Sequence, residues 1–560
     1  MSVSNYIEIT LFLVVLAGIS PLLGIYIARV LSDDPSSSHL RRMDAWAFKF
    51  IGSQARGENS WSHYLRALLV FNLMGFAALV LVQRLQGHLP LNPQGLGPVP
   101  FWLAVNTAVS FVTNTNWQAY SGEATLSYFT QVIGLTVQNF VSAATGIAVM
   151  VALARGLRGR QTGSVGNFWR DLTRATLYVL LPLSLIWAIL LVSEGVVQNF
   201  AGYVTVHPLS GGEQIVPMGP AASQVAIKQL GTNGGGFFGV NSAHPFENPT
   251  PLSNFLQVLG ILLIPAALPF AFGKLVGNIR HGAALFFSML VLFLLTFIPL
   301  LWSELQINTV LGAGFLEGKE IRFGVSGSAL WAGATTVASN GSVNSMLDSF
   351  SPLAGGLALL NILMGEVVFG GVGSGVYGIV LFAILTVFIA GLMVGRTPEY
   401  LGKKIEAREV LPAVLGIIVP SAVILLFSAL ALSTEAGLSS VLNKGPHGLT
   451  EVLYAFASGA GNNGSAFGGL NANTGFYNFF IALAMVIGRY GVIIPVLYIA
   501  GCLAQKKTVP ASSGTFSTEG TLFSFLLCAI ILIVGALTFF PVLSLGPIME
   551  HLLMLQGRAF

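Results

Sequence analysis

Cysteine and charged residues are scarce in this chain, and each scarcity excludes a class of protein. The 560 residues include two cysteines and 9% charged residues, whereas soluble domains contain roughly 25%. Cys502 and Cys528 both stand in or beside apolar runs, so neither a disulfide framework nor a metal site with paired cysteines is expected. No basic cluster is interleaved with aromatic residues, and nucleic-acid binding is therefore not expected either.

Hydrophobic residues make up 54% of the chain and the mean hydropathy is +0.77, which predicts a polytopic membrane protein. A membrane-spanning helix needs about 20 apolar residues. Near the N-terminus, the uninterrupted apolar stretch from about Leu11 to Leu31 follows Glu8 and has no basic segment before it, so an uncleaved spanning helix is predicted there. The ten runs cover approximately residues 6–30, 64–85, 124–154, 172–194, 252–277, 281–302, 354–395, 410–432, 476–503 and 521–541.

Four shorter apolar segments, of ten to fourteen residues, are too short to cross a bilayer and are typical of re-entrant half-helices. They cover approximately residues 101–113, 219–231, 327–338 and 448–458. Each ends at a polar phrase rich in asparagine and glycine: TNTNWQ from Thr113, GTNGGG from Gly231, ASNGS from Ala338 and GAGNNGS from Gly459. From Asn116 to Gly234, Gly341 and Gly464 the intervals are 118, 107 and 123 residues.

This regularity predicts an all-α polytopic membrane protein with one structural unit used four times. Each unit is a helix, a half-helix with its pore loop, and a second helix, arranged with pseudo-fourfold symmetry. One additional helix stands at each end of the chain, which brings the number of spanning helices to about ten. The predicted divisions are a first helix with an interfacial segment (1–62), four repeats (63–160, 161–279, 280–405 and 406–508), of which the third has a broken second helix, and a last helix with a tail (509–560).

The distribution of basic residues predicts the orientation of the chain. Nineteen of the 26 lysines and arginines fall on one side of the predicted spans, and that side should be cytoplasmic. The four polar loops and both termini then lie outside. Residues 40–51 carry aromatic residues among Arg41, Arg42 and Lys49, which is typical of an interfacial helix, although an ordinary connecting loop is the alternative.

The polar phrases have the composition expected of a binding site for a dehydrated monovalent cation. Glycine and asparagine tolerate left-handed backbone, so successive carbonyl groups can replace the water around an ion. Irregular backbone at membrane depth is tolerated only where protein buries it or where it lines a cavity. The phrases contain no acidic residue, although Glu123 and Glu247 follow the first two, and a divalent ion would be expected to need more carboxylate groups. Ordinary turns between helices are the alternative for any single loop.

Longer stretches carry a family resemblance: TNTNWQAYSGE from Thr113, GTNGGGFFGVNSAHPFENPTP from Gly231, GEVVFGGVGSGVY from Gly365 and GLMVGRTPEYLGKK from Gly391. Over nearly its full length the chain resembles the potassium-binding A subunit of the bacterial Kdp potassium-pumping ATPase, in the superfamily of potassium transporters. The resemblance implies a filter that takes K⁺ from outside. The positions it implies for the filter are Asn114, Thr115, Asn116, Gln118, Thr232, Asn233, Gly234, Ser339, Asn340, Gly341, Asn462, Asn463 and Gly464.

The resemblance also implies partners. In such a complex K⁺ passes through an intramembrane tunnel to a P-type ATPase catalytic subunit, and an accessory C subunit and a small single-span subunit complete the assembly. The implied location is the bacterial inner membrane, in contact with lipid, with the filter facing the periplasm or exterior. The sequence has neither a Walker A loop, nor an Asp-Lys-Thr-Gly phosphorylation site, nor a segment long enough for a nucleotide domain. We therefore expect no catalytic residue and no covalent cofactor, with ATP used only by the partner.

Two features lie where they could close the path below the filter. The apolar run 353–395 is interrupted by Gly370, Gly371, Gly373 and Gly375. These glycines permit a broken helix or an intramembrane loop, and by resemblance a gate, whereas a patch for close helix packing is the alternative. Arg489 lies inside a spanning run and should face the interior, where its charge would oppose downward exit of a cation. An ion pair with Glu366 is the second possibility, and both roles can hold.

Several alternatives remain at this point. Gln118 could line the vestibule or support the filter from behind. The segment His244-Pro245-Phe246-Glu247 could be mistaken for metal ligands, but its proline breaks the helix that would align them, so K⁺ is the only metal ion expected. The competing function is a self-contained potassium channel or secondary transporter of the same superfamily. An intramembrane enzyme has little support, because no H-E-x-x-H or G-x-S-x-G motif stands in a suitable context.

Overall fold

A computed structural model describes the chain at residues 3–32, 44, 49, 57–159, 161–307, 310, 314, 316–393, 395–510 and 516–558. Within these residues, ten helices are long and apolar enough to cross a membrane. The predicted fold class, an all-α polytopic membrane protein, is confirmed. The predicted interfacial segment 40–51 lies outside the described residues except for Asp44 and Lys49.

Each of the four repeats contains a first helix, a half-helix that ends at a polar phrase, and a second helix. The fourth half-helix is the longest of the four and begins at Gly445, three residues before the predicted start. In chain order the three elements are α3 (Trp61–Leu85), α4 (Phe101–Val112) and α6 (Val137–Arg158); α8 (Leu181–Ser193), α9 (Ala221–Leu230) and α10 (Pro251–Val276); α11 (Ile279–Glu304), α12 (Gly324–Val337) and α14 (Ser374–Met393); α15 (Ala407–Ser433), α17 (Gly445–Ala460) and α18 (Gly475–Gln505).

The second helix of the third repeat is broken. The apolar run that the sequence predicts over residues 353–395 forms α13 (Pro352–Leu363) and α14, which are separated by an irregular loop over residues 364–373. Gly365, Gly370 and Gly373 in this loop have φ angles of 83°, 63° and 88°, which side chains rarely tolerate. The glycines therefore form the break in the helix.

Local signals in the sequence set the ends of the helices. Thr250 and Ser253 form a capping box at the start of α10, and Gly277 ends this helix with a left-handed φ of 83°. The half-helix α17 begins at Gly445 with proline next to it, where the missing N–H costs no hydrogen bond. Three π-helical segments, η3 (Thr130–Thr136), η4 (Ala175–Leu180) and η7 (Ser544–Ile548), interrupt longer helices.

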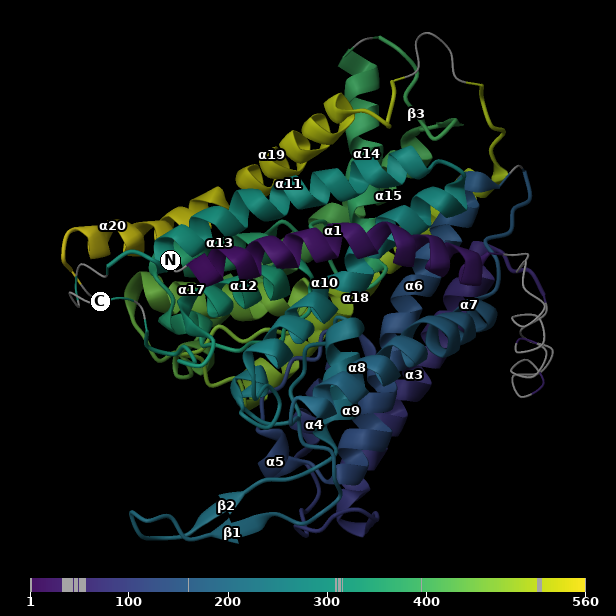
Figure 1. Cartoon of the computed structure of the whole chain (residues 1–560). Coiled ribbons are helices and arrows are strands. Elements are labelled where there is room, and N and C mark those ends of the chain that lie inside the picture. The colour runs from purple at the N-terminus through teal and green to yellow at the C-terminus, as the bar shows by residue number, and fades with distance from the viewer. Residues whose placement is uncertain are drawn as a thin grey trace.

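Helices outside the repeats stand at both ends of the chain. The N-terminal helix α1 (Val3–Leu31) packs along α10, and the C-terminal helix α19 (Thr521–Leu543) packs along α11 and α14. The start of α1 and the end of the short helix α20 (Met549–Leu555) lie at the same end of the molecule (Figure 1). This arrangement agrees with an even number of spans.

Two small hairpins extend from the helical body. Strands β1 (Val204–Val206) and β2 (Gln214–Val216) pair antiparallel between α8 and α9 and project away from the helices (Figure 1). Strands β3 (Glu399–Tyr400) and β4 (Lys403–Lys404) pair far from the first hairpin, at the opposite end of the molecule (Figure 1). The remaining short elements are η2 (Gln86–His88), α5 (Gly122–Thr125), α7 (Phe168–Arg174), η5 (Asn241–Ala243), η6 (Leu347–Ser349) and α16 (Glu435–Leu438).

The centre of the molecule is formed by the second helices of the repeats. Of the ten spans, α6, α10 and α14 are the most buried. Glycines bring their backbones into contact with neighbours: a Cβ on Gly156 of α6 would overlap the carbonyl oxygen of Ala500 on α18. Small residues at such crossings are the usual means of close helix packing in membranes. The half-helices end inside this central group of helices.

Candidate functional site

The four polar phrases fold in the same way at the ends of the four half-helices. In each, one residue in the last turn of the half-helix accepts two backbone N–H groups from the phrase that follows, through its carbonyl or hydroxyl oxygen. The Ser110 carbonyl accepts from Thr115 (2.9 Å) and Asn116 (3.1 Å). The corresponding acceptors are the carbonyl of Lys228, the carbonyl and hydroxyl of Thr335, and the carbonyl of Ser458.

The central three residues of each phrase, here called the loop triplets, share an unusual backbone. In every triplet the first and the third residue have positive φ angles, between 46° and 89°. Asparagine and glycine adopt this conformation at the lowest cost, which explains their recurrence in the sequence. The loop triplets are Asn114–Asn116, Thr232–Gly234, Ser339–Gly341 and Asn462–Gly464.

Neighbouring triplets touch in a cyclic order. A Cβ on Gly234 would overlap the carbonyl oxygen of Asn340 in the next triplet. In the same way, Gly341 lies against the Asn463 carbonyl, and Gly464 lies against the Thr115 carbonyl, which returns the contacts to the first triplet. Glycine is therefore required at these three positions because the next loop fills the space where a side chain would begin.

Side-chain amides connect the same neighbours. Asn114 donates to the Thr232 carbonyl at 3.1 Å, and Asn340 donates to the Lys228 carbonyl at 3.0 Å. Asn463 donates to the Thr335 carbonyl at 3.0 Å, and Asn462 donates to the Thr115 hydroxyl at 2.8 Å. The four loops thus form a closed ring, which individual turns between helices would not do.

The ring is rich in uncharged oxygen atoms and has no carboxylate in its triplets. The two carboxylates that follow the first two phrases are engaged elsewhere: Glu123 accepts from the backbone N–H of Gly239 at 2.7 Å, and Glu247 pairs with Lys228. Carbonyl and hydroxyl oxygens suit a monovalent cation better than Ca²⁺ or Mg²⁺, which usually bind carboxylate groups. That the predicted residues bind K⁺ stays a prediction.

Gln118 joins the first phrase to the second. Its amide nitrogen donates to the Gly236 carbonyl at 3.0 Å, and its amide oxygen accepts from the Gly236 N–H at 2.8 Å. The residue also borders an outer cavity of about 300 Å³. The sequence left open whether Gln118 lines the vestibule or supports the filter from behind. Its side chain does both, because it borders the outer cavity and bonds to Gly236.

The loop 364–373 lies directly against the triplets. The Val372 N–H donates to the Thr232 hydroxyl at 2.9 Å, and the Gly370 N–H donates to the Val337 carbonyl at 2.9 Å. A Cβ on Gly373 would overlap the Gly146 carbonyl of α6. The predicted glycines therefore pack under the ring, and their role in gating stays a prediction.

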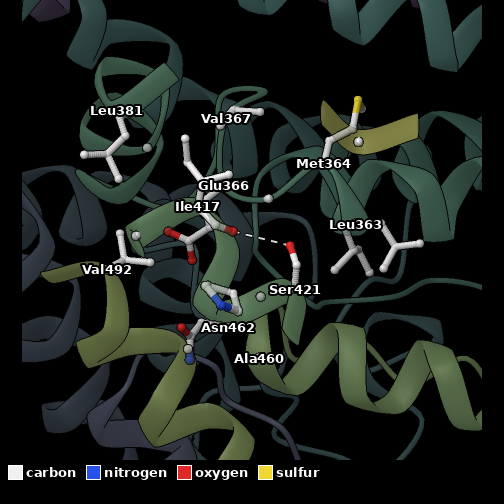
Figure 2. A pocket seen from close by; sticks show the side chains of 18 of the residues that line it. Leu363, Met364, Glu366, Val367, Leu381, Ile417, Ser421, Ala460, Asn462 and Val492 are labelled. Carbon is white, nitrogen blue, oxygen red and sulfur yellow. Dashed lines mark hydrogen bonds between the residues drawn. The ribbon is translucent and has the colours of Figure 1, made fainter. Parts of the chain in front are cut away.

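Arg489 on α18 lies below the ring. The residue is 5% exposed, and its guanidinium nitrogen lies 3.8 Å from a carboxylate oxygen of Glu366. The ion pair between Arg489 and Glu366, which the sequence analysis gave as a possibility, is therefore present. Both residues line a cavity of about 80 Å³ that reaches Asn462 and is bordered by residues of α14, α15 and α19. Figure 2 shows Glu366 and Asn462 in this cavity, with Leu381 of α14 and Ser421 of α15.

Two residues of α6 support the first triplet and were missed by sequence reasoning. Asn116 donates to the Asn139 amide oxygen at 2.6 Å, and the Ser142 hydroxyl donates to the Asn114 amide oxygen at 2.7 Å. Their spacing of three residues in an apolar helix places them on one helix face. Two polar residues on one face of an apolar helix were the signal in the sequence that could have predicted this contact.

One cluster in the described part of the chain has the composition of a metal site. Ligand atoms of Asp348, His447 and Glu451 lie within 4.8 Å of one another. However, both ring nitrogens of His447 are already bonded, to Asp348 at 2.7 Å and Glu550 at 2.8 Å. Burial lowers the pKa of His447, but these bonds and the two carboxylate charges together raise it to about 10. A proton therefore competes strongly with any metal ion there, and the expectation of no transition-metal site stays a prediction.

His244 has a packing role. Its ring stacks on Phe238 with 4.1 Å between ring centroids and an interplanar angle of 19°. Burial lowers the pKa of His244 below its usual value. This histidine is therefore largely uncharged near neutral pH.

Comparison with known proteins identifies the family. The sequence profile of the family described as the potassium-transporting ATPase A subunit, KdpA, matches residues 10–552. The chain belongs to the KdpA family. A relative from Leptospira interrogans, named potassium-transporting ATPase potassium-binding subunit, is 55% identical over 562 residues, covering 100% of both chains. A relative of the same name from Pseudomonas aeruginosa is 56% identical over 541 residues, covering 95% of this chain and 96% of the relative.

A solved structure extends the likeness of this KdpA family member beyond its sequence relatives. The potassium transporter TrkH from Vibrio parahaemolyticus superposes with a TM-score of 0.53 at 15% identity. The match covers 88% of this chain and 97% of TrkH. At this identity the likeness shows the fold alone, and it confirms the predicted architecture of repeats.

Proposed function

We propose that this chain binds and selects K⁺ as the potassium-binding subunit of an ATP-driven uptake complex. The observation that carries the proposal is the closed ring of four loop triplets, whose uncharged oxygens would replace the water around one cation. Membership in the KdpA family agrees with this role. The thirteen predicted filter residues are proposed as the K⁺ site, with Gln118 acting through Gly236 rather than as a ligand.

The orientation proposed is the one that the basic residues predict. The ring opens to the periplasm or exterior of a bacterial inner membrane, and both termini lie outside. The half-helices then point their C-terminal ends, which carry partial negative charge, at the ion. A cation entering from outside would thus be attracted before it loses its water.

The exit proposed is sideways. The loop 364–373 packs under the triplets, and the positive charge of Arg489 lies beneath them, so both oppose straight passage to the cytoplasm. The cavity near Glu366 leads instead between α14, α15 and α19 (Figure 2). We propose that this cavity belongs to the route by which K⁺ reaches a P-type ATPase subunit, which alone uses ATP, with a C subunit and a small single-span subunit completing the complex.

Three experiments test this function. The purified complex should hydrolyse ATP faster with K⁺ than with Na⁺, and a P-type ATPase subunit should co-purify with this chain from membranes. Equal stimulation by the two ions would contradict the proposal. Liposomes that contain this chain alone should show no sustained K⁺ uptake, whereas robust flux through the chain alone would favour the competing channel or secondary transporter.

A further inference from the structure

The second phrase differs from the other three because three glycines, Gly234, Gly235 and Gly236, follow one another. Glycine allows more backbone conformations than any other residue, so the peptide units between these glycines can rotate at little cost. Carbonyl groups that coordinate an ion must be held in a fixed direction before the ion arrives. Contacts from outside the phrase must therefore fix this segment.

Asn241 makes such a contact. Its side-chain amide donates to the Gly234 carbonyl with 2.7 Å between the nitrogen and the oxygen. From the described part of the chain, no hydrogen bond reaches the corresponding carbonyls of Asn116, Gly341 or Gly464. The second loop is thus the one whose third carbonyl is held by a side chain.

Lys228 holds Asn241 in turn. Its ammonium group donates to the Asn241 amide oxygen at 2.7 Å, to the Ser242 hydroxyl at 2.9 Å and to the Glu247 carboxylate. These bonds use all three N–H groups of the ammonium. The side chains of Lys228 and Glu247 are both 0% exposed, and the second carboxylate oxygen accepts from the Phe238 N–H at 2.8 Å. The ion pair therefore anchors Asn241 without leaving a charge unpaired.

The main chain of Lys228 contacts the same triplet from the other side. Its carbonyl accepts from the N–H groups of Asn233 at 2.8 Å and Gly234 at 3.0 Å, and from the Asn340 side chain at 3.0 Å. Gln118 holds Gly236, the last of the three glycines. The flexible segment is thus fixed at both ends.

We propose that Lys228 and Asn241 are positioning residues, which fix the direction of the Gly234 carbonyl and thereby set the K⁺ affinity and selectivity of the second loop. Neither residue needs to touch the ion. A buried pair of charges is costly to place in a membrane protein, and conformational specificity is a recognised reason for such pairs. This inference rests on the proposed function of the ring as a K⁺ filter.

The test uses Asn241→Leu in the complete complex and measures K⁺-stimulated ATP hydrolysis. We expect the KM for K⁺ to rise about tenfold, which corresponds to about 1.4 kcal/mol, with kcat unchanged within about twofold. Discrimination against Na⁺ should fall. The matched control is Asn248→Leu, because Asn248 is also a buried asparagine of the segment that follows this loop but bonds to Asn254 and Ser253.

A second variant separates positioning from folding. The double substitution Lys228→Met with Glu247→Gln removes both charges together, so neither partner is left buried and unpaired. It should raise the KM for K⁺ in the same way. If both variants keep the KM of the control, the inference is wrong although the proposed function stands. If the unmodified complex is not stimulated by K⁺, the proposed function itself fails.

Discussion

The ring of loop triplets is symmetric, whereas the region beneath it is not. In the ring all four repeats adopt the same backbone, with paired positive φ angles and cyclic contacts between neighbours. Beneath it the repeats differ, because the break between α13 and α14 occurs in the third repeat and Arg489 comes from the fourth. Symmetry suits the selection of a spherical ion, and in the function proposed above its loss beneath the ring would give the ion one direction in which to leave.

The largest effect on K⁺ binding should come from a substitution in the symmetric ring of loop triplets. Gly464→Ala would place a Cβ against the Thr115 carbonyl and would also add a side chain at a φ of 88°. Both effects displace oxygens that the ion needs, so K⁺ affinity should fall by at least about a hundredfold, or about 2.7 kcal/mol. Titration calorimetry with K⁺ on the purified complex measures this.

Gly557→Ala is the control for that substitution. This glycine also has a positive φ, of 72°, but a Cβ there meets no atom within 4 Å. The K⁺ affinity of the Gly557→Ala complex should match that of the unmodified complex. Equal losses in both variants would show that backbone strain alone, rather than the ring, explains the result.

The next largest effect should come from filling the cavity in the asymmetric region beneath the ring. Ser421 on α15 borders the cavity beneath the ring (Figure 2), and Ser421→Trp would occupy much of its volume. K⁺ binding should persist, whereas K⁺-stimulated ATP hydrolysis and uptake should fall at least about tenfold, because the ion could not leave sideways. Ile418→Trp, at a position of α15 that is 53% exposed, should have little effect on either measurement. Normal uptake by the cavity variant would exclude this route.

A smaller effect is expected at Arg489. Arg489→Gln keeps a polar side chain but removes the charge that we propose to oppose downward exit. K⁺ affinity of the ring should change by less than about threefold, while ATP hydrolysed per K⁺ taken up should rise because ions leak. Rubidium flux in proteoliposomes, measured beside ATP hydrolysis, gives this ratio. An unchanged ratio would show that Arg489 does not oppose downward exit and serves only in its ion pair with Glu366.

The smallest effect concerns stability outside the ring. His447 has a pKa of about 10 in the folded chain, above its ordinary value near 6.5. Its stabilising contribution is therefore complete below about pH 6.5 and is lost as the pH rises through about 10. Thermal unfolding of the complex should show lower stability at pH 10 than at pH 7.

His447→Gln should remove part of that pH dependence and cost on the order of 1–3 kcal/mol at pH 7, because hydrogen bonds to Asp348 and Glu550 are lost. His207→Gln, on the exposed hairpin between β1 and β2, is the control and should leave the profile unchanged. A pH profile identical in both variants would contradict the assigned role of His447.

Local patterns made most of the fold predictable. The ten spans, the four half-helices and the four phrases follow from hydrophobic length and from the special backbone of asparagine and glycine, which are properties of short segments. The break in the third repeat was visible in Gly370 to Gly375 for the same reason. The starts of α12 and α17 were each placed three residues too late, because glycine and proline weaken the apolar signal there.

The contacts behind the ring were not predictable. Lys228 lies in an apolar half-helix and its partners Asn241 and Glu247 come 13 and 19 residues later, in an irregular segment whose path no periodicity sets. Asn139 and Ser142 reach the first triplet from a different helix. Such contacts depend on tertiary packing, and a single sequence does not contain their distances.

Anomalous diffraction from crystals of the complex soaked with Tl⁺, a heavy substitute for K⁺, would show directly whether the four loop triplets bind one ion. We expect a Tl⁺ peak inside the ring, within coordination distance of oxygens from all four loop triplets, and loss of that peak in Gly464→Ala. A peak bound by one or two loops only, or one that persists unchanged in the variant, would show that the four loops do not form one K⁺ site.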